Sequence, residues 1–283
     1  MARGSFPALV LGSGPVGTDL MMKIGRRNGP VSAISAMHVD EFPDARVVFN
    51  TLPGGRDRAT GSAARMIDLV PGTGPWCVPA VNLDDNLDDA YLNMATGDAQ
   101  VGVPVVAAMT RSAIVSYAEV VSSISTKAVS SDVRTDIDHV NEQTTAAVQF
   151  VGGAQRAKTI SIVTPADPPP AARCTVYCLL EGDPDRHRIE HDVAAMVQKV
   201  RAYAPGYRLK RPIQFDTIPA ADPLVIPETG KFSGTRVTMF LEIIGAADHF
   251  PFHAGPFDLV TAAALNTAER IAARGCETPG VIR

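Results

Sequence analysis

The sequence lacks several features that mark particular classes of protein. It has four cysteines in 283 residues, too few for a disulfide framework. Its net charge is −4 and no Lys or Arg run exceeds a pair, so no nucleic-acid partner is expected. No apolar stretch approaches the roughly 18 residues of a membrane span, and residues 1–14 lack the apolar core of a signal peptide. We therefore expect a cytoplasmic protein without a membrane partner.

The composition and the apolar patterning indicate a two-part α/β protein. Hydrophobic residues make up 46% and charged residues 20%, as in ordinary globular enzymes. At roughly 150 residues per domain, the length predicts about two domains. Short apolar strands alternating with a helix predict a parallel sheet in the first half, and longer strands between long helices predict an α+β second half. The expected strands are 7–11, 32–39, 46–50, 65–69, 158–164, 173–180, 214–219 and 237–244, and the expected helices are 18–27, 184–203 and 258–274.

A glycine-rich turn follows the first expected strand. Gly12, Gly14 and Gly17 have the GxGxxG spacing, in which glycines let the backbone approach a pyrophosphate at a helix N-terminus. Asp40 stands 23 residues beyond Gly17, where a carboxylate would bind the ribose of NAD and repel the 2′-phosphate of NADP. An unrelated glycine turn is the alternative interpretation. The predicted cofactor-binding residues are Gly12, Ser13, Gly14, Val16, Gly17 and Asp40.

Several segments resemble the acylating acetaldehyde dehydrogenases. They are Gly12–Lys23, Ile67–Leu69, Gly74–Leu83 and most of Asn93–Arg274. The resemblance implies NAD-dependent oxidation of acetaldehyde to acetyl-CoA through a cysteine thioester, in a homodimer that pairs with a 4-hydroxy-2-oxovalerate aldolase. It also implies a glyceraldehyde-3-phosphate dehydrogenase-like fold. We expect a shortened Rossmann-type nucleotide-binding domain over 1–96 plus 256–283, and a catalytic and dimerisation domain over 97–255.

The chain departs from the family pattern at the catalytic residues. Gly97 stands where the family has its nucleophilic cysteine, and glycine has no side chain to replace a thiol. Asp98 follows it directly, while Cys174 takes the place of a family aspartate. The thiol and the carboxylate therefore look exchanged across one cleft.

Further departures fall on the cofactor side. The helix and strand that follow the second strand in the family are absent, and the loop 50–56 differs from the family's loop beside the cofactor. Pro256 replaces an asparagine that contacts the nicotinamide, and proline has no side-chain donor for that contact. Two outcomes stay open: NAD is retained as cofactor, or its binding is weakened or lost.

Cys174 is the candidate for a relocated nucleophile. His249 or His253 would act as its base, and Asp98 or Asp248 would orient that base. A buried, inert strand cysteine is the alternative, since free cysteine is among the most buried residue types. The helical pair His187 and His191 is expected on a solvated face, with no metal site.

Two functions follow from these patterns. The first is an NAD(H)-dependent oxidoreductase that acts on an aldehyde or imine without a covalent thiol intermediate and has lost the CoA-acylating half-reaction. The second is a repurposed protein without redox chemistry. It would use Cys174 for acyl transfer or hydrolysis of an acyl substrate, or would serve as a scaffold for an aldolase-type partner. Whether the chain is catalytic stays open between these two predictions.

Overall fold

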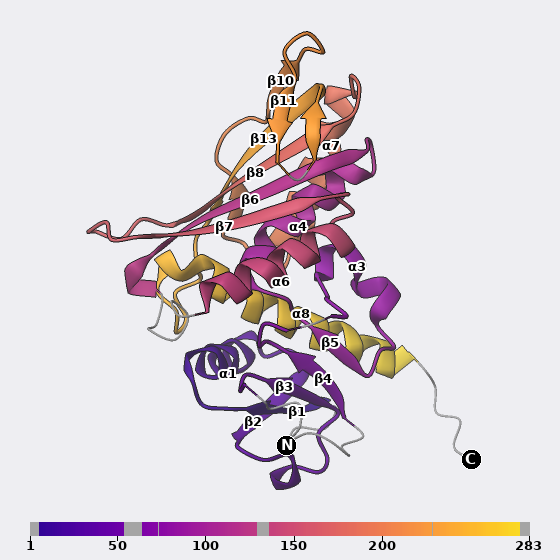
Figure 1. Ribbon diagram of the computed structural model, residues 1–283. Coiled ribbons are helices and arrows are strands. Elements are labelled where there is room, and N and C mark those ends of the chain that lie inside the picture. The colour runs from indigo at the N-terminus through magenta and orange to yellow at the C-terminus, as the bar shows by residue number, and fades with distance from the viewer. Residues whose placement is uncertain (1–5, 54–63, 73, 129–135, 228, 278–283) are drawn as a thin grey trace.

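A computed structural model shows two β-sheets with helices packed between them (Figure 1). The structure describes residues 6–53, 64–72, 74–128, 136–227 and 229–277, with the side chains of 41 and 275–277 left out. Within these residues no helix is both long enough and apolar enough to cross a bilayer.

Sheet A is parallel and follows the order β2-β1-β3-β4-β5 in the described chain. Its strands are β1 (Phe6–Leu11), β2 (Val31–Ala36), β3 (Val47–Asn50), β4 (Arg65–Asp68) and β5 (Tyr91–Asn93). Only the short 3₁₀ helix η1 (Val39–Glu41) lies between β2 and β3 in sequence, and β3 pairs on the other side of β1. The order in which strands are added to the sheet therefore reverses between β1 and β3. Open α/β sheets bind their ligands at such a switch point.

Helix α1 (Pro15–Arg27) begins at the glycine turn because Pro15 provides the φ angle of a first helical residue. Its apolar face, with Leu20 and Ile24, is buried. Helix α3 (Pro79–Asn86) precedes β5 in sequence. These elements confirm the predicted strands 7–11, 46–50 and 65–69 and the first helix. The predicted strand 32–39 is too long, because β2 ends at Ala36 and the chain turns into η1.

Sheet B is mixed and follows the order β10-β13-β8-β6-β7, with β9 also paired to β13. Only β6 and β7 run parallel among these pairs. The strands are β6 (Val115–Ser125), β7 (Ala157–Thr164), β8 (Ala172–Leu180), β9 (Tyr207–Leu209), β10 (Gln214–Ile218) and β13 (Gly234–Ile243), while β11 (Leu224–Ile226) and β12 (Gly230–Phe232) form a separate hairpin. The 3₁₀ helix η2 (Thr126–Ala128) follows β6.

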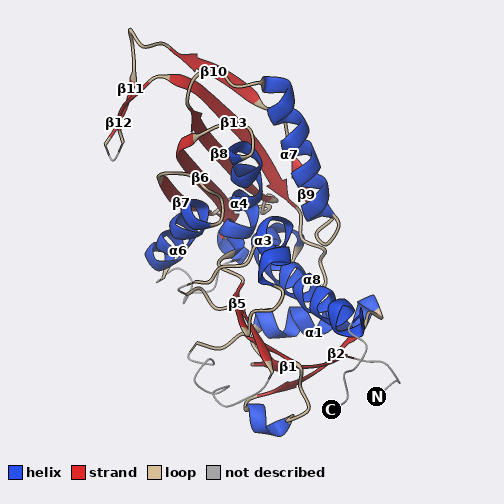
Figure 2. Ribbon diagram, turned by 90° about the vertical axis from the view of Figure 1, so that its right-hand side faces the viewer, coloured by secondary structure: helices blue, strands red, loops and turns tan. Residues whose placement is uncertain are grey.

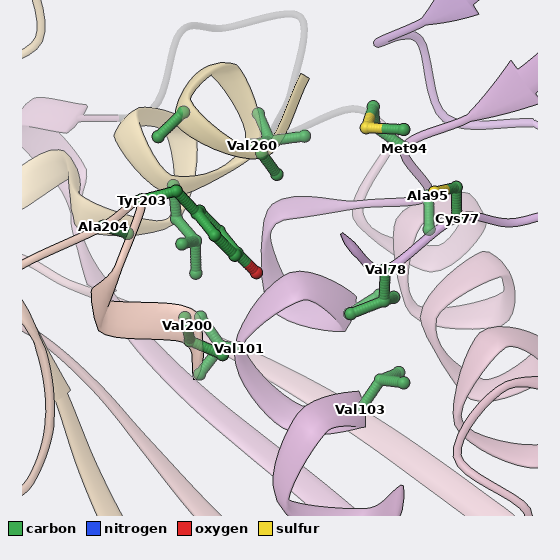
Figure 3. Close-up of a cluster of buried hydrophobic side chains, with 14 of the residues drawn as sticks. Cys77, Val78, Met94, Ala95, Val101, Val103, Val200, Tyr203, Ala204 and Val260 are labelled. Atoms are coloured by element: carbon green, nitrogen blue, oxygen red, sulfur yellow. The ribbon is translucent and has the colours of Figure 1, made fainter. Parts of the chain in front are cut away.

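Helices α4 (Gly97–Thr110), α6 (Ile137–Phe150) and α7 (Arg186–Arg201) cover one face of sheet B (Figure 2). After the 3₁₀ helix η3 (Phe252–Ala254), helix α8 (Gly255–Glu277) runs between the two sheets and packs on α1 and α4. Helix α4 is apolar all round, as expected for a central helix. In Figure 3 its residue Val101 lies beside Val200 of α7, and Val103 lies on the side of Val78, which precedes α3. The α/β fold with two unlike halves is the one that the sequence predicts.

Candidate active site

A pocket of about 270 Å³ lies where the two sheets meet. We call it the cleft pocket. On the sheet A side it is lined by Val16, Thr51, Pro53, Leu69, Val70 and Pro71, and between the sheets by Ala95, Thr96, Gly97, Asp98, Pro256, Phe257 and Val260. On the sheet B side it is lined by Ile124, Ile137, Val140, Ser161 and Val163. The lining residues on the sheet A side follow the carboxyl ends of β1, β3 and β4. The pocket therefore lies at the point where the strand order of sheet A reverses.

The glycine turn has the geometry that the sequence pattern requires. Gly12 has φ +105°, a conformation that favours glycine, and a β-carbon there would lie 2.6 Å from Thr51 Oγ1. A β-carbon on Gly17 would lie 2.4 Å from the carbonyl oxygen of Gly12. Gly14 is exposed and has open space where its side chain would be. The turn therefore packs closely against the sheet and leaves its outer backbone open to a ligand, which fits a pyrophosphate.

Asp40 lies four residues beyond the end of β2, within η1, and is exposed. The sequence placed it at the strand end itself, and that placement is wrong because β2 stops at Ala36. Ser13 is exposed at the turn, and Val16 lines the cleft pocket. Of the loop 50–56, residues 54–56 lie outside the described residues.

The N-terminus of α4 opens on the cleft pocket from the other side. Ala95 adopts φ +55°, an uncommon conformation for a residue with a side chain, and its N–H donates to Asn93 Oδ1 at 2.7 Å. Thr96 caps the helix by accepting the N–H of Ala99 at 3.0 Å, and its hydroxyl lies 2.6 Å from that of Thr144. These contacts fix the position of Gly97, the first helical residue.

Gly97 packs directly against the first turn of α8. A β-carbon built on Gly97 would lie 2.7 Å from the carbonyl oxygen of Pro256 and 2.9 Å from the proline Cβ. Real β-carbons do not come this close to backbone atoms, so a side chain at position 97 requires α4 or α8 to shift. The two sequence departures, one on the thiol side and one on the nicotinamide side, are therefore in mutual contact.

Cys174 lies on β8 and is not among the described residues that line the cleft pocket. It is 2% exposed and pairs in register with Ser122 of β6. Burial raises the pKa of its thiol well above the usual value, and the negative charge of Asp98 raises it further. Cys174 and Asp98 are near enough to interact electrostatically, but Cys174 lies in surroundings that favour the neutral thiol.

The two candidate histidines lie on the segment before α8. His249 is exposed, and its backbone N–H donates to Asp19 Oδ1 at 3.2 Å. His253 is 8% exposed, and neither ring nitrogen has a hydrogen-bond partner among the described residues. Asp248 forms ion pairs with Arg26 and with Lys23. Its carboxylate therefore contacts helix α1. Neither histidine lines the cleft pocket in the described part of the chain.

A buried charge cluster, which the sequence analysis missed, holds α1 against α8. Lys23 is 5% exposed, and its ammonium lies 2.5 Å from Asp19 Oδ2 and 2.7 Å from Asp258 Oδ1. Asp19 also accepts hydrogen bonds from Thr261 Oγ1 at 2.5 Å and from the N–H of Phe250 at 3.3 Å. Asp19 and Lys23 share the apolar face of α1 at i, i+4 spacing, and a charged pair on that face was the available signal. The cluster positions the first turn of α8, which carries Pro256.

Ser161 of β7 and Asn141 of α6 are two further polar residues that the sequence did not reveal. The hydroxyl of Ser161 lies 3.0 Å from Asp98 Oδ2 and 2.7 Å from Asn141 Oδ1. No motif marked either residue, because their proximity arises only when α6 packs on β7. The described residues contain no group of three side chains that could hold a metal ion.

The protein has the glyceraldehyde-3-phosphate dehydrogenase-like fold. In this class a parallel sheet with a glycine turn is joined to a mixed sheet across one cleft. The crystal structure of aspartate semialdehyde dehydrogenase II from Vibrio cholerae matches with a TM-score of 0.59, covering 95% of this chain and 99% of that one. The sequence identity is 10%, so this match shows the fold alone.

Comparison with known sequences shows the family. The family model for the dimerisation domain of prokaryotic acetaldehyde dehydrogenase matches residues 97–251. A protein named "Probable inactive acetaldehyde dehydrogenase 1" from Mycolicibacterium vanbaalenii is 46% identical, over 97% of each chain. Acetaldehyde dehydrogenase 1 from Mycobacterium ulcerans is 43% identical, over 98% of this chain and 93% of its own. The chain belongs to the acetaldehyde dehydrogenase family, which confirms the resemblance read from its motifs.

Proposed function

We propose that this chain is a non-acylating member of the acetaldehyde dehydrogenase family. Its cleft keeps a dinucleotide-binding turn and has lost the thioester chemistry. The observation that carries the proposal is the contact between Gly97 and Pro256, which leaves no room for a side chain at the nucleophile's position. The relative from Mycolicibacterium vanbaalenii is named a probable inactive acetaldehyde dehydrogenase, which agrees with a loss of the acylating activity.

The residues of the turn fit a dinucleotide. Gly12, Gly14 and Gly17 would hold the pyrophosphate, and the unpaired N–H groups at the start of α1 would face it. Bound NAD(H) supplies hydride chemistry, which needs no thiol when the substrate is an aldehyde or imine. The turn belongs to residues 1–96 and 256–283, which we propose as the shortened nucleotide-binding part, beside a catalytic and dimerisation part at 97–255.

Cys174 is the thiol that a relocated covalent mechanism would need. Its burial and its raised pKa both oppose nucleophilic reactivity, so acyl transfer through Cys174 is the less favoured use of this cleft. The second candidate function is therefore non-catalytic, as a homodimeric scaffold for an aldolase-type partner. The dimerisation family model over 97–251 supports the homodimer.

Titration of the purified protein with NADH, followed by nucleotide fluorescence, tests the proposal. Saturable binding below millimolar NADH is expected for the dinucleotide-binding turn. A Gly14→Val variant serves as the matched control, because a β-carbon at position 14 meets no protein atom within 4 Å. Loss of NADH binding in that variant would assign the nucleotide to the turn. Absence of binding to the parent protein at millimolar NADH would contradict the proposal and favour the scaffold.

A further inference from the structure

The cleft pocket contains one ionisable side chain among its described lining residues, and this is Asp98. Asp98 is half-buried and lies in the first turn of α4. Its surroundings in the pocket are mostly aliphatic, with Ile124 from β6, Val163 from β7 and Val140 from α6. No Lys, Arg or His is among the described lining residues, so no cation compensates a negative charge there.

The hydrogen bonds around Asp98 form a chain through Ser161. Ser161 Oγ lies 3.0 Å from Asp98 Oδ2 and 2.7 Å from Asn141 Oδ1. A hydroxyl carries one proton, so Ser161 donates to only one of these two oxygens. When it donates to Asn141, it accepts a hydrogen bond from Asp98, and the one carboxyl proton is then held by Ser161. When it donates to Asp98 Oδ2, with the Asn141 amide reversed, a proton on Oδ1 of Asp98 stays available to a ligand.

The electrostatic surroundings favour the protonated form. Burial raises the pKa of Asp98, and the hydrogen bond with the hydroxyl of Ser161 partly opposes that rise. The titratable group that interacts with Asp98 is the Cys174 thiol on β8, and because burial keeps this thiol neutral it adds no charge beside Asp98. The neighbours from β6, β7 and α6 are Ser122, Ser161 and Asn141, none of which titrates in this range.

We propose that Asp98 is a neutral carboxylic acid that donates a hydrogen bond to the carbonyl oxygen of a small, uncharged aldehyde or ketone in the cleft pocket. A neutral carboxyl group offers one O–H donor, and with Ser161 donating to Oδ2 the proton on Oδ1 is the one that a carbonyl oxygen accepts. The aliphatic walls suit the short hydrocarbon chain, and the volume of about 270 Å³ equals that of about nine waters at about 30 Å³ each. Carboxylate or phosphate ligands find no cation in the pocket. This inference rests on the proposed non-acylating function, since it assigns the cleft a non-covalent carbonyl ligand.

Infrared difference spectroscopy on the whole protein without cofactor tests the protonation of Asp98. The parent spectrum at pH 7 minus that of Asp98→Asn is expected to contain the C=O band of a protonated carboxylic acid. The matched control is Asp40→Asn, because Asp40 is exposed. Its difference spectrum is expected to contain ionised carboxylate bands instead. Carboxylate bands alone in the Asp98 difference spectrum would overturn the proposal.

Binding of 2-pentanone labelled with ¹³C at its carbonyl carbon tests the ligand class. In the parent protein we expect the bound carbonyl stretch to shift to lower frequency, and the affinity to fall about tenfold as pH rises through the pKa of Asp98, because the donor is lost. The Asp98→Asn variant keeps the size of the side chain, and its affinity is expected to be independent of pH. No saturable binding to the parent protein, equal pH profiles in the two proteins, or preference for pentylamine over the ketone would each contradict the inference.

These outcomes are separable from the fate of the proposed function. NADH binding depends on the glycine turn and is measured in the absence of ketone. A protein that binds NADH but shows an ionised Asp98 retains the proposed function and loses this inference. A protein that acylates CoA loses the proposed function whatever the protonation of Asp98.

Discussion

The carbonyl oxygen of Pro256 lies 2.7 Å from the point where a β-carbon on Gly97 would stand. The two residues are far apart in sequence and meet because the first turn of α8 crosses the N-terminus of α4. The contact joins the two positions at which the sequence departs from the family pattern, the expected thiol position and the expected nicotinamide-contacting position. Restoring one residue without the other is therefore expected to disturb the site.

Gly97→Cys alone is expected to lower the free energy of unfolding by about 1 to 3 kcal/mol, the usual cost of an added side chain in a packed site. Urea denaturation measures this loss. Gly25→Cys is the matched control, because a β-carbon on Gly25 meets nothing within 4 Å, so its stability is expected to stay the same or rise slightly. Equal stability of the two cysteine variants would contradict the steric account.

Adding Pro256→Asn to Gly97→Cys keeps the Cβ that stands 2.9 Å from the new Cβ, but it opens the proline ring and releases the φ angle at position 256, so the first turn of α8 can move away. We expect the double variant to recover part of the lost stability, with a coupling energy of about 0.5 to 3 kcal/mol in a double-mutant cycle. The same denaturation experiment measures it. Strict additivity of the two substitutions would show that the residues do not act on each other.

Cys174 is expected to react with iodoacetamide no faster than Cys178 in the folded protein. Both lie buried on β8, and burial raises the pKa of Cys178 to about 12 and that of Cys174 above its usual range. Little thiolate is therefore present at pH 8, and both cysteines should be labelled together only on unfolding. Peptide mapping by mass spectrometry measures the two rates. Selective labelling of Cys174 in the native protein would revive the relocated nucleophile.

Lys23→Met is expected to destabilise the protein by about 3 to 5 kcal/mol, because it leaves Asp19 and Asp258 buried without their cation. Lys127→Met is the matched control. Lys127 pairs with Asp167 on the surface, and such exposed pairs contribute about 0 to 1 kcal/mol. Thermal and urea unfolding compare the two variants. A small effect of Lys23→Met would mean that the cluster does not hold α1 against α8.

Glu242 is expected to make the free energy of unfolding fall at acidic pH. Hydrogen bonds from Arg208 and Lys210 hold the pKa of Glu242 below its usual value. This contribution to stability is complete above the unfolded pKa, near 4.5, and is lost as the pH falls through the lower folded value. Glu242→Gln is expected to flatten the stability profile below about pH 4.5, whereas Glu190→Gln, on the surface of α7, is expected to leave it unchanged. Urea denaturation from pH 7 to pH 3 measures both, and identical slopes in the parent and Glu242→Gln would contradict the assignment.

The sequence predicted much of the fold and part of the site. The strand 7–11, the glycine turn and helix α1 follow from local periodicity and turn chemistry, which act within a few residues. The end of β2 was misplaced because Met37 and His38 extend the strand-like pattern past Ala36, where the chain turns. Local pattern does not encode where a strand loses its pairing partner.

The contacts that decide the chemistry arise from long-range packing. Gly97 and Pro256 were each visible as departures, but their contact depends on where α8 crosses α4. The neighbours of Asp98 on β7 and α6 carried no motif at all. The sequence left Cys174 either as a reactive thiol or as a buried strand cysteine. The structure shows it buried, on the strand β8 against which α4 packs.

The loss of acylating activity is tested most directly by measuring NADH formation by the purified protein supplied with acetaldehyde, CoA and NAD. We expect no rate above the protein-free control, because the cleft has no thiol at position 97 and no room for a side chain there. Turnover of about 1 s⁻¹ or faster, the range of ordinary enzymes, would contradict it.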